Sequence, residues 1–182
     1  MKIRVWLLSL LLLIAYFSNE VLARPIDADV HANQLKKADT LDFNFNVIDL
    51  SGKSISLNKW KGKFVLINLW ATWCGPCRVE MPHLQKLYTT FEHPDFEIIT
   101  FSLDKQNQVE KVKSYLSRSN YTFSVFFPDK DFPDVLKVKS IPSSFLIDDK
   151  GKIVWQHTGV FRFDKSSFKK KLRQLMHSNE AE

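Results

Sequence analysis

Apolar residues along the chain fall either into short unbroken runs or into stripes with helical spacing. The runs at 64–70 and 96–103 are partly β-branched and aromatic, which is typical of strands buried on both faces of a sheet. Stripes in which apolar residues recur at every third or fourth position predict helices over about 76–90 and 109–119. From residue 64 onward, the pattern therefore alternates strands with helices.

Two β-hairpins are predicted where a glycine-containing turn separates two short apolar segments. The first pairs 45–50 with 54–57 around a Ser-Gly-Lys turn, and the second pairs 144–148 with 153–157 around Asp-Lys-Gly. Both turns contain a residue that tolerates positive φ. One hairpin thus precedes the alternating region, and the other follows it.

The remaining pattern completes an α/β fold. A short strand is predicted at 123–127, a short helix at 132–138, and a last helix striped through 168–176 with Asp164 as its N-cap. Strands alternate with helices first, and an antiparallel hairpin and a helix close the chain. This order predicts a mixed central sheet with helices on both faces.

Residues 1–23 have the pattern of an export signal. Two basic residues give a positive start, an apolar stretch covers 5–17, and Ala23 ends a site suited to cleavage. The stretch is shorter than the roughly 20 residues of a membrane helix, but a retained N-terminal anchor is the alternative. In both cases we expect a flexible arm at 24–40 and a domain at 41–182 in the periplasm or another extracytoplasmic space.

Composition and charge narrow the possible function classes. Of 182 residues, 45% are apolar, 25% are charged and 15 are phenylalanine, so the chain can bury a core without structural disulfides or metals. The net charge of +6 comes from basic residues that are spread thinly, without an aromatic-interleaved basic patch. We therefore expect no nucleic-acid partner and no metal.

The chain has two cysteines, Cys74 and Cys77, separated by Gly75 and Pro76. A bridge across so small a loop removes little chain entropy, so the pair suits redox chemistry better than stabilisation. It lies where a predicted strand meets a predicted helix, whose first-turn N–H groups favour a thiolate. Pro76 suits the first helical position, and Gly75 leaves the sulfur uncovered. These features predict Cys74 as the attacking thiol and Cys77 as the resolving thiol.

Three other uses of the cysteine pair are alternatives. A zinc site needs four ligands, and the sequence has no second cysteine pair and no closely spaced histidine pair. A structural bridge is disfavoured by the size of its loop. An exported copper-binding module more usually has three residues between its cysteines and a distant histidine; His157 is present, but the cysteine spacing differs.

Two motifs reveal a family resemblance. The run 68–82, NLWATWCGPCRVEMP, is similar to the active-site run of the TlpA/ResA-like thioredoxins, an exported branch that includes cytochrome c maturation reductases. The run 141–148, IPSSFLID, matches the second motif of this branch, and the resemblance covers about residues 40–177. It implies a thioredoxin-like fold with an N-terminal β-hairpin and a thiol-disulfide oxidoreductase activity that needs no cofactor.

The resemblance also implies roles in substrate binding. Pro142 matches the cis-proline of the family, whose loop faces the cysteine pair, and the Ile141 backbone would pair with an extended substrate. Trp73 resembles an aromatic residue that flanks the site. Together with Gly75 and Pro76, it is expected to contact the substrate.

Proton transfer is assigned to Glu80 by the same resemblance. It matches an acidic residue that the branch keeps near the active site, where a partly buried carboxylate would accept and return the proton of Cys77. A solvated surface glutamate is the alternative. Asn68 stands where thioredoxin itself has a buried acid, and an amide cannot titrate, which strengthens the case for Glu80. His83 has no partner visible in the sequence and is expected at the surface.

The resulting hypothesis is a monomeric dithiol reductase that acts on the disulfides of exported proteins. The resemblance suggests a membrane thiol reductant as electron donor and cytochrome c maturation as a candidate role. A thiol-dependent peroxidase is an alternative, although that chemistry needs Thr or Ser three residues before the reactive cysteine, where this chain has Ala71. A non-catalytic thiol-binding or metallochaperone module is another.

Overall fold

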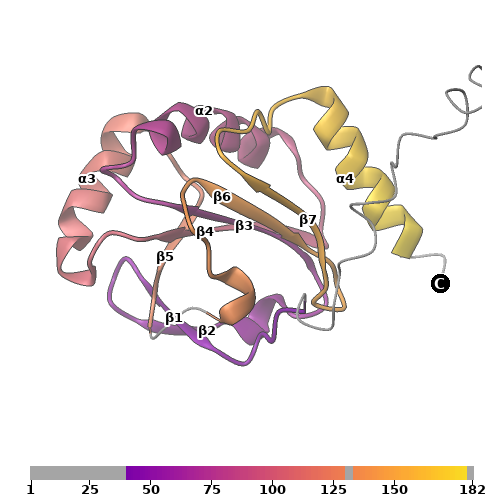
Figure 1. The fold of residues 1–182 in the computed structure, drawn as a ribbon, viewed down its shortest axis with the longest axis horizontal. Helices are drawn as coiled ribbons and strands as arrows, with labels where there is room; N and C mark the ends of the chain where they lie inside the picture. Colours follow the sequence, from indigo (N-terminus) through magenta and orange to yellow (C-terminus); the bar gives the residue numbers. More distant parts are fainter. Residues whose placement is uncertain (1–39, 130–132, 180–182) are drawn as a thin grey trace, which may run out of the picture. The chain divides into compact units, whose positions relative to one another are not determined.

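The computed structural model of the protein describes residues 40–129 and 133–179 (Figure 1). The predicted signal or anchor at 1–23 and the predicted arm, apart from Thr40, lie outside the described residues. Within the described ranges, no helix has the length and apolar character needed to cross a bilayer. The domain boundary at residue 41 stays a prediction.

Seven strands form one mixed sheet in the order β2-β1-β5-β4-β3-β6-β7. Strands β3, β4 and β5 are parallel, whereas β6 pairs antiparallel with β3, β7 with β6, and β1 with both β2 and β5. Both predicted hairpins and the mixed sheet are therefore confirmed. The strands are β1 (Asn46–Asp49), β2 (Ser54–Ser56), β3 (Phe64–Trp70), β4 (Phe96–Ser102), β5 (Ser124–Pro128), β6 (Ser143–Ile147) and β7 (Ile153–Thr158).

The two faces of the sheet are covered differently (Figure 1). The α-helices pack on one face, where Met81, Val112 and Leu172, one from each helix, join the same buried cluster. Short 3-10 helices and the segment before β1 cover the opposite face. The prediction of helices on both faces is thus confirmed, with only single-turn helices on the second. The helices are α2 (Gly75–Thr90), α3 (Val109–Ser119), α4 (Ser166–Asn179), η1 (Leu57–Trp60), η2 (Gln106–Gln108) and η3 (Asp134–Leu136).

Strand β3 determines which side chains lie beneath α2. All of its residues are buried, as expected for a central strand with both faces covered. Leu66 and Trp70 belong to the cluster that contains the α-helices, and Ile67 belongs to the cluster on the opposite face. Because side chains alternate along a strand, Asn68 lies on the same face as Leu66 and Trp70, toward α2.

The expected N-cap of the last helix is wrong. Helix α4 begins at Ser166, and the Lys165 carbonyl accepts the first intrahelical bond, from the Lys169 N–H at 3.2 Å. Lys165 therefore occupies the N-cap position. Asp164 lies one residue earlier and makes different contacts, which are described below.

Candidate active site

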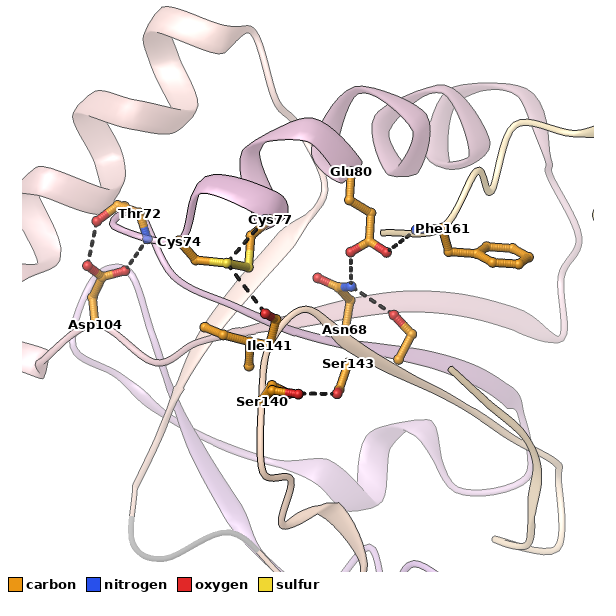
Figure 2. Close-up of a disulfide and its surroundings, with 11 residues drawn as sticks. Asn68, Thr72, Cys74, Cys77, Glu80, Asp104, Ser140, Ile141, Ser143 and Phe161 are labelled. Atoms are coloured by element: carbon orange, nitrogen blue, oxygen red, sulfur yellow. Dashed lines mark hydrogen bonds between the residues drawn. A yellow bond between two sulfur atoms is a disulfide. The ribbon is translucent and has the colours of Figure 1, made fainter. Parts of the chain in front are cut away.

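The cysteine pair lies at the junction between β3 and α2, as predicted. Cys74 is the N-cap of α2, and Cys74 and Cys77 form a disulfide with their Cα atoms 5.3 Å apart (Figure 2). The Cys77 N–H donates to Cys74 Sγ over 3.1 Å. This donor is one of the free N–H groups of the first helical turn, so it would also stabilise a thiolate on Cys74 after reduction.

The position predicted for Pro76 needs a small correction. Helix α2 begins at Gly75, so Pro76 is the second helical residue and not the first. The physical argument is unchanged, because the N–H groups of the whole first turn lack intrahelical partners and proline loses nothing there.

The two sulfur atoms differ in their access to solvent. Cys74 is 5% exposed and Cys77 is fully buried, whereas the neighbouring Trp73 is 62% exposed. An attacking thiolate must be reached by another molecule, and a resolving thiol needs to reach only its partner. The exposures agree with Cys74 as the outer cysteine and Cys77 as the inner one.

The loop before β6 faces the disulfide. The Ile141–Pro142 peptide bond is cis, as the family resemblance implies. The Ile141 carbonyl oxygen lies 3.7 Å from Cys74 Sγ, and Figure 2 shows it pointing at the sulfur. Two hydrogen bonds hold the loop, one from Ser143 Oγ to the Ser140 carbonyl at 2.8 Å and one from the Gly159 N–H to the Pro142 carbonyl at 2.8 Å.

An apolar groove of about 550 Å³ opens beside Cys74, between the active-site turn and this loop. Trp73, Gly75, Pro76 and Ile141, all predicted to contact substrate, line it. Pro142 is buried behind the groove and does not line it. Sequence reasoning missed the other lining residues, which are Leu103, Val138, Lys139 and Ser140. Leu103 directly follows β4 and the other three follow η3, and periodicity does not show that these two segments meet beside the cysteines.

Glu80 is a residue of α2, and it is fully buried. This excludes the alternative of a solvated surface residue. Its Oε2 accepts a hydrogen bond from Asn68 Nδ2 and its Oε1 accepts one from the Phe161 N–H, both at 2.9 Å. Burial raises the pKa of Glu80 to about 7, although both hydrogen bonds act in the opposite direction. A carboxyl group with this pKa can exchange a proton near neutral pH.

Glu80 and Cys77 are three residues apart on α2, so their side chains lie on the same face of the helix. Figure 2 shows both directed toward the sheet, with Asn68 on β3 beneath them. The structure therefore brings together the three predicted catalytic residues, Cys74, Cys77 and Glu80. Their individual roles remain proposals.

A second buried carboxylate, Asp104, was missed by sequence reasoning. It accepts hydrogen bonds from the Thr72 N–H at 2.8 Å and from the Thr72 hydroxyl (Figure 2). A further hydrogen bond comes from Ser102 Oγ at 2.9 Å. Thr72 lies two residues before Cys74, so Asp104 fixes the turn that carries the reactive sulfur. The available signal was its place after β4, at the same sheet edge as the end of β3, where parallel strands build sites.

The structure gives His83 a partner that was not visible in the sequence. Its Nδ1 lies 3.0 Å from Asp164 Oδ1, and Arg162 Nη2 lies 3.6 Å from Asp164 Oδ2. Burial favours the neutral acid, but the charges of His83 and Arg162 outweigh it and lower the pKa of Asp164. This contact ties α2 to the loop whose Phe161 N–H donates to Glu80.

Metal ligands do not gather at the site. Across residues 40–129 and 133–179, no three His, Cys, Asp or Glu side chains are grouped so that they could hold a metal ion. The cysteine pair is closed as a disulfide. The chemistry available here is thiol–disulfide exchange with a buried acid beside the inner cysteine.

A buried strand that leads into a Cys-x-x-Cys helix, opposite a cis-proline loop, defines a protein of the thioredoxin fold. A family model described as the AhpC/TSA family matches residues 37–156. The thiol-disulfide oxidoreductase ResA of Halalkalibacterium halodurans is 35% identical over 127 residues, which cover 69% of this chain and 70% of that protein. The chain belongs to the AhpC/TSA family and, within it, to the group of ResA thiol-disulfide oxidoreductases.

Other relatives agree with this assignment. ResA of Bacillus thuringiensis subsp. konkukian is 39% identical over 119 residues, which is 64% of this chain and 66% of that relative, just under two thirds of its length. A thiol:disulfide interchange protein from Bacteroides sp. superposes with a TM-score of 0.60 at 31% identity, covering 73% of this chain and 86% of that one. StoA from Bacillus subtilis superposes with a TM-score of 0.56 at 26% identity, covering 71% of this chain and 93% of that one.

Proposed function

We propose that the protein is a thiol-disulfide oxidoreductase that reduces disulfides in exported proteins. One observation carries the proposal: a disulfide caps a helix, with its outer sulfur at the mouth of an apolar groove and its inner sulfur buried on the helix face that bears Glu80. An outer sulfur activated by a helix N-terminus is suited to attack. A buried inner sulfur is suited to resolution.

The reaction begins from the reduced pair. The Cys74 thiolate, stabilised by the first turn of α2, attacks a substrate disulfide and forms a mixed disulfide, and one substrate sulfur leaves as a thiolate. Glu80 then takes the proton of Cys77, and Cys77 attacks Cys74 Sγ. The second substrate sulfur is released, so two electrons pass from the cysteine pair to the substrate and the Cys74–Cys77 disulfide forms.

The groove beside Cys74 is proposed to hold an extended segment of the substrate. Trp73 offers a large exposed apolar surface at its rim, and the Ile141 carbonyl lies close to the reacting sulfur. Pro142 would act indirectly by holding this loop in place, because its own carbonyl is already bonded to the Gly159 N–H. Backbone pairing with little dependence on side chains suits a protein that meets several unfolded or flexible substrates.

Replacing Trp73 by alanine should weaken protein-substrate binding without disturbing the fold, because the side chain is 62% exposed. We expect KM for a protein disulfide to rise about tenfold, the size of a typical aromatic contact at an interface. Turnover of a small disulfide that does not fill the groove should stay within twofold of the wild-type rate. Equal losses on both substrates would argue against a docking role.

Localisation and partners follow from the N-terminal signal pattern and the family. We propose that the protein works outside the cytoplasm as a monomer, receives electrons from a membrane thiol reductant and serves thiols such as those of apocytochromes c. Support comes from the Gly-Pro dipeptide between the cysteines, which resembles that of reducing members, and from the relatives named ResA.

The direction of electron flow is tested by the reduction potential of the cysteine pair, measured in glutathione buffers. We expect a value closer to the roughly −270 mV of thioredoxin than to the roughly −120 mV of a strong oxidant. The reduced protein should reduce insulin disulfides and should consume hydrogen peroxide no faster than Cys74→Ser. A strongly oxidising potential would reject the reductase, and rapid peroxide turnover would instead favour a peroxidase.

A further inference from the structure

Among the residues that the structure describes, none donates a hydrogen bond to the side-chain oxygen of Asn68, although Asn68 is fully buried. Both hydrogens of Nδ2 are used, one by Glu80 Oε2 at 2.9 Å and one by Ser144 Oγ at 2.8 Å. The Oδ1 atom is buried and has no hydrogen-bond partner within residues 40–129 and 133–179. A buried acceptor without a donor costs free energy, so such atoms are rare in native proteins and call for an explanation.

Neighbouring hydroxyl groups do not supply the missing donor. Thr100, opposite Asn68 on β4, donates to the Ser124 carbonyl at 3.1 Å. Ser143 lies within reach of the Ser140 carbonyl and the Thr158 hydroxyl. Figure 2 shows Oδ1 turned away from the Glu80 carboxylate and directed to the side where the disulfide lies.

The disulfide is the oxidised state of the site, in which neither sulfur carries a hydrogen. On reduction the S–S bond breaks and two electrons and one proton are taken up, so that Cys74 becomes the thiolate and Cys77, which is fully buried, becomes a thiol. Its Sγ–H needs an acceptor among buried groups, and Cys77 shares the α2 face with Glu80, whose carboxylate already binds the Asn68 amide.

We infer that Asn68 Oδ1 accepts a hydrogen bond from the Cys77 thiol in the reduced protein, an inference that rests on the proposed thiol–disulfide exchange. Asn68 is then a positioning residue for the resolving thiol, with Cys77 at its oxygen and Glu80 at its nitrogen. The contact exists only in the reduced state, while the oxidised state leaves the acceptor unpaired. It therefore favours the dithiol over the disulfide and raises the reduction potential.

The test separates this contact from the bond between Asn68 and Glu80. Asn68→Leu is introduced into a Glu80→Gln background, in which any effect of Asn68 through the Glu80 carboxylate is already removed. Asn68→Ala in the same background is the second variant if the leucine protein does not fold. We expect the equilibrium constant for reduction to fall about fivefold, the effect of one ordinary hydrogen bond, which corresponds to ~20 mV for a two-electron couple.

Infrared spectroscopy gives an independent readout. In Cys74→Ser the chain has one thiol, that of Cys77, and its S–H stretching band should lie at the frequency of a hydrogen-bonded thiol and move to that of a free thiol when Asn68 is also replaced. Ser144→Ala, which removes a partner of Nδ2 but leaves Oδ1 in place, serves as the control and should change neither the band nor the potential.

Unchanged potential and unchanged band in the Asn68 variants would overturn the inference. That outcome is distinct from a failure of the proposed function, which would appear as a wild-type protein that cannot reduce disulfides.

Discussion

Replacing Cys77 by serine is expected to slow the turnover of a protein disulfide on the order of a thousandfold, because the intramolecular attack that releases the substrate is lost. Cys74 should remain reactive, since its thiolate is stabilised by the first turn of α2. The Cys77 N–H that donates to Cys74 Sγ belongs to the backbone and survives the substitution. The variant should therefore accumulate as a mixed disulfide with its substrates.

Trapping is measured by non-reducing electrophoresis of Cys77→Ser expressed where the protein normally acts, followed by identification of the linked proteins. Cys74→Ser is the matched control: it retains a single cysteine, but that cysteine is fully buried and should trap little. A non-catalytic binding module is indicated if Cys74 of the Cys77→Ser variant reacts with small thiol reagents yet forms no mixed disulfide with a protein.

Most of the strand and helix pattern was predictable because it follows from local periodicity. The unbroken apolar run before the cysteines had to be a strand covered on both faces, and its observed limits, Phe64–Trp70, match the prediction. Helix α2 followed from its stripe and from the Cys-Gly-Pro-Cys start. The ends of short elements were less predictable from periodicity. The helix predicted at 132–138, for example, is a single 3-10 turn at Asp134–Leu136.

The partners of the buried polar side chains were not predictable, because they depend on register between distant segments. Asn68 meets Ser144 since β3 pairs antiparallel with β6 in the register that sets these two residues opposite each other. Asp104 reaches Thr72 only because β3 and β4 end at the same edge of the sheet. Single-sequence periodicity contains no information about the register of β3 and β6. The shared sheet edge could have placed Asp104 near the end of β3, but it does not specify the hydrogen bonds to Thr72.

The His83–Asp164 contact shows the same limit and links two parts of the site. The sequence showed no partner for His83 and predicted a surface position for it, and the helix-start pattern made Asp164 a reasonable cap. The structure instead brings the two side chains to 3.0 Å, beside the loop that supplies a hydrogen bond to Glu80. The environment of the proposed proton carrier is therefore assembled from β3, α2 and the loop after β7.

Glu80 should make the stability of the oxidised protein depend on pH. Its pKa is raised from 4.5 to about 7, mainly by burial, so between these pH values the folded protein binds a proton that the unfolded chain has lost. Stability is then fully retained below pH 4.5 and falls as the pH rises through 7. The shift corresponds to about 3 kcal/mol of unfolding free energy lost across this window.

The glutamine of Glu80→Gln has nearly the same shape as glutamate and cannot titrate. The difference in unfolding free energy between wild type and this variant therefore isolates the contribution of the Glu80 carboxyl group. Unfolding by guanidinium chloride, with the disulfide intact, should show wild type losing about 3 kcal/mol relative to Glu80→Gln between pH 4 and pH 8. The rate at which Cys77 resolves a mixed disulfide should rise with pH through about 7 in wild type and lose that inflection in the variant. Parallel stability curves with an unchanged rate profile would show that Glu80 holds no proton near neutral pH and would remove it from the mechanism.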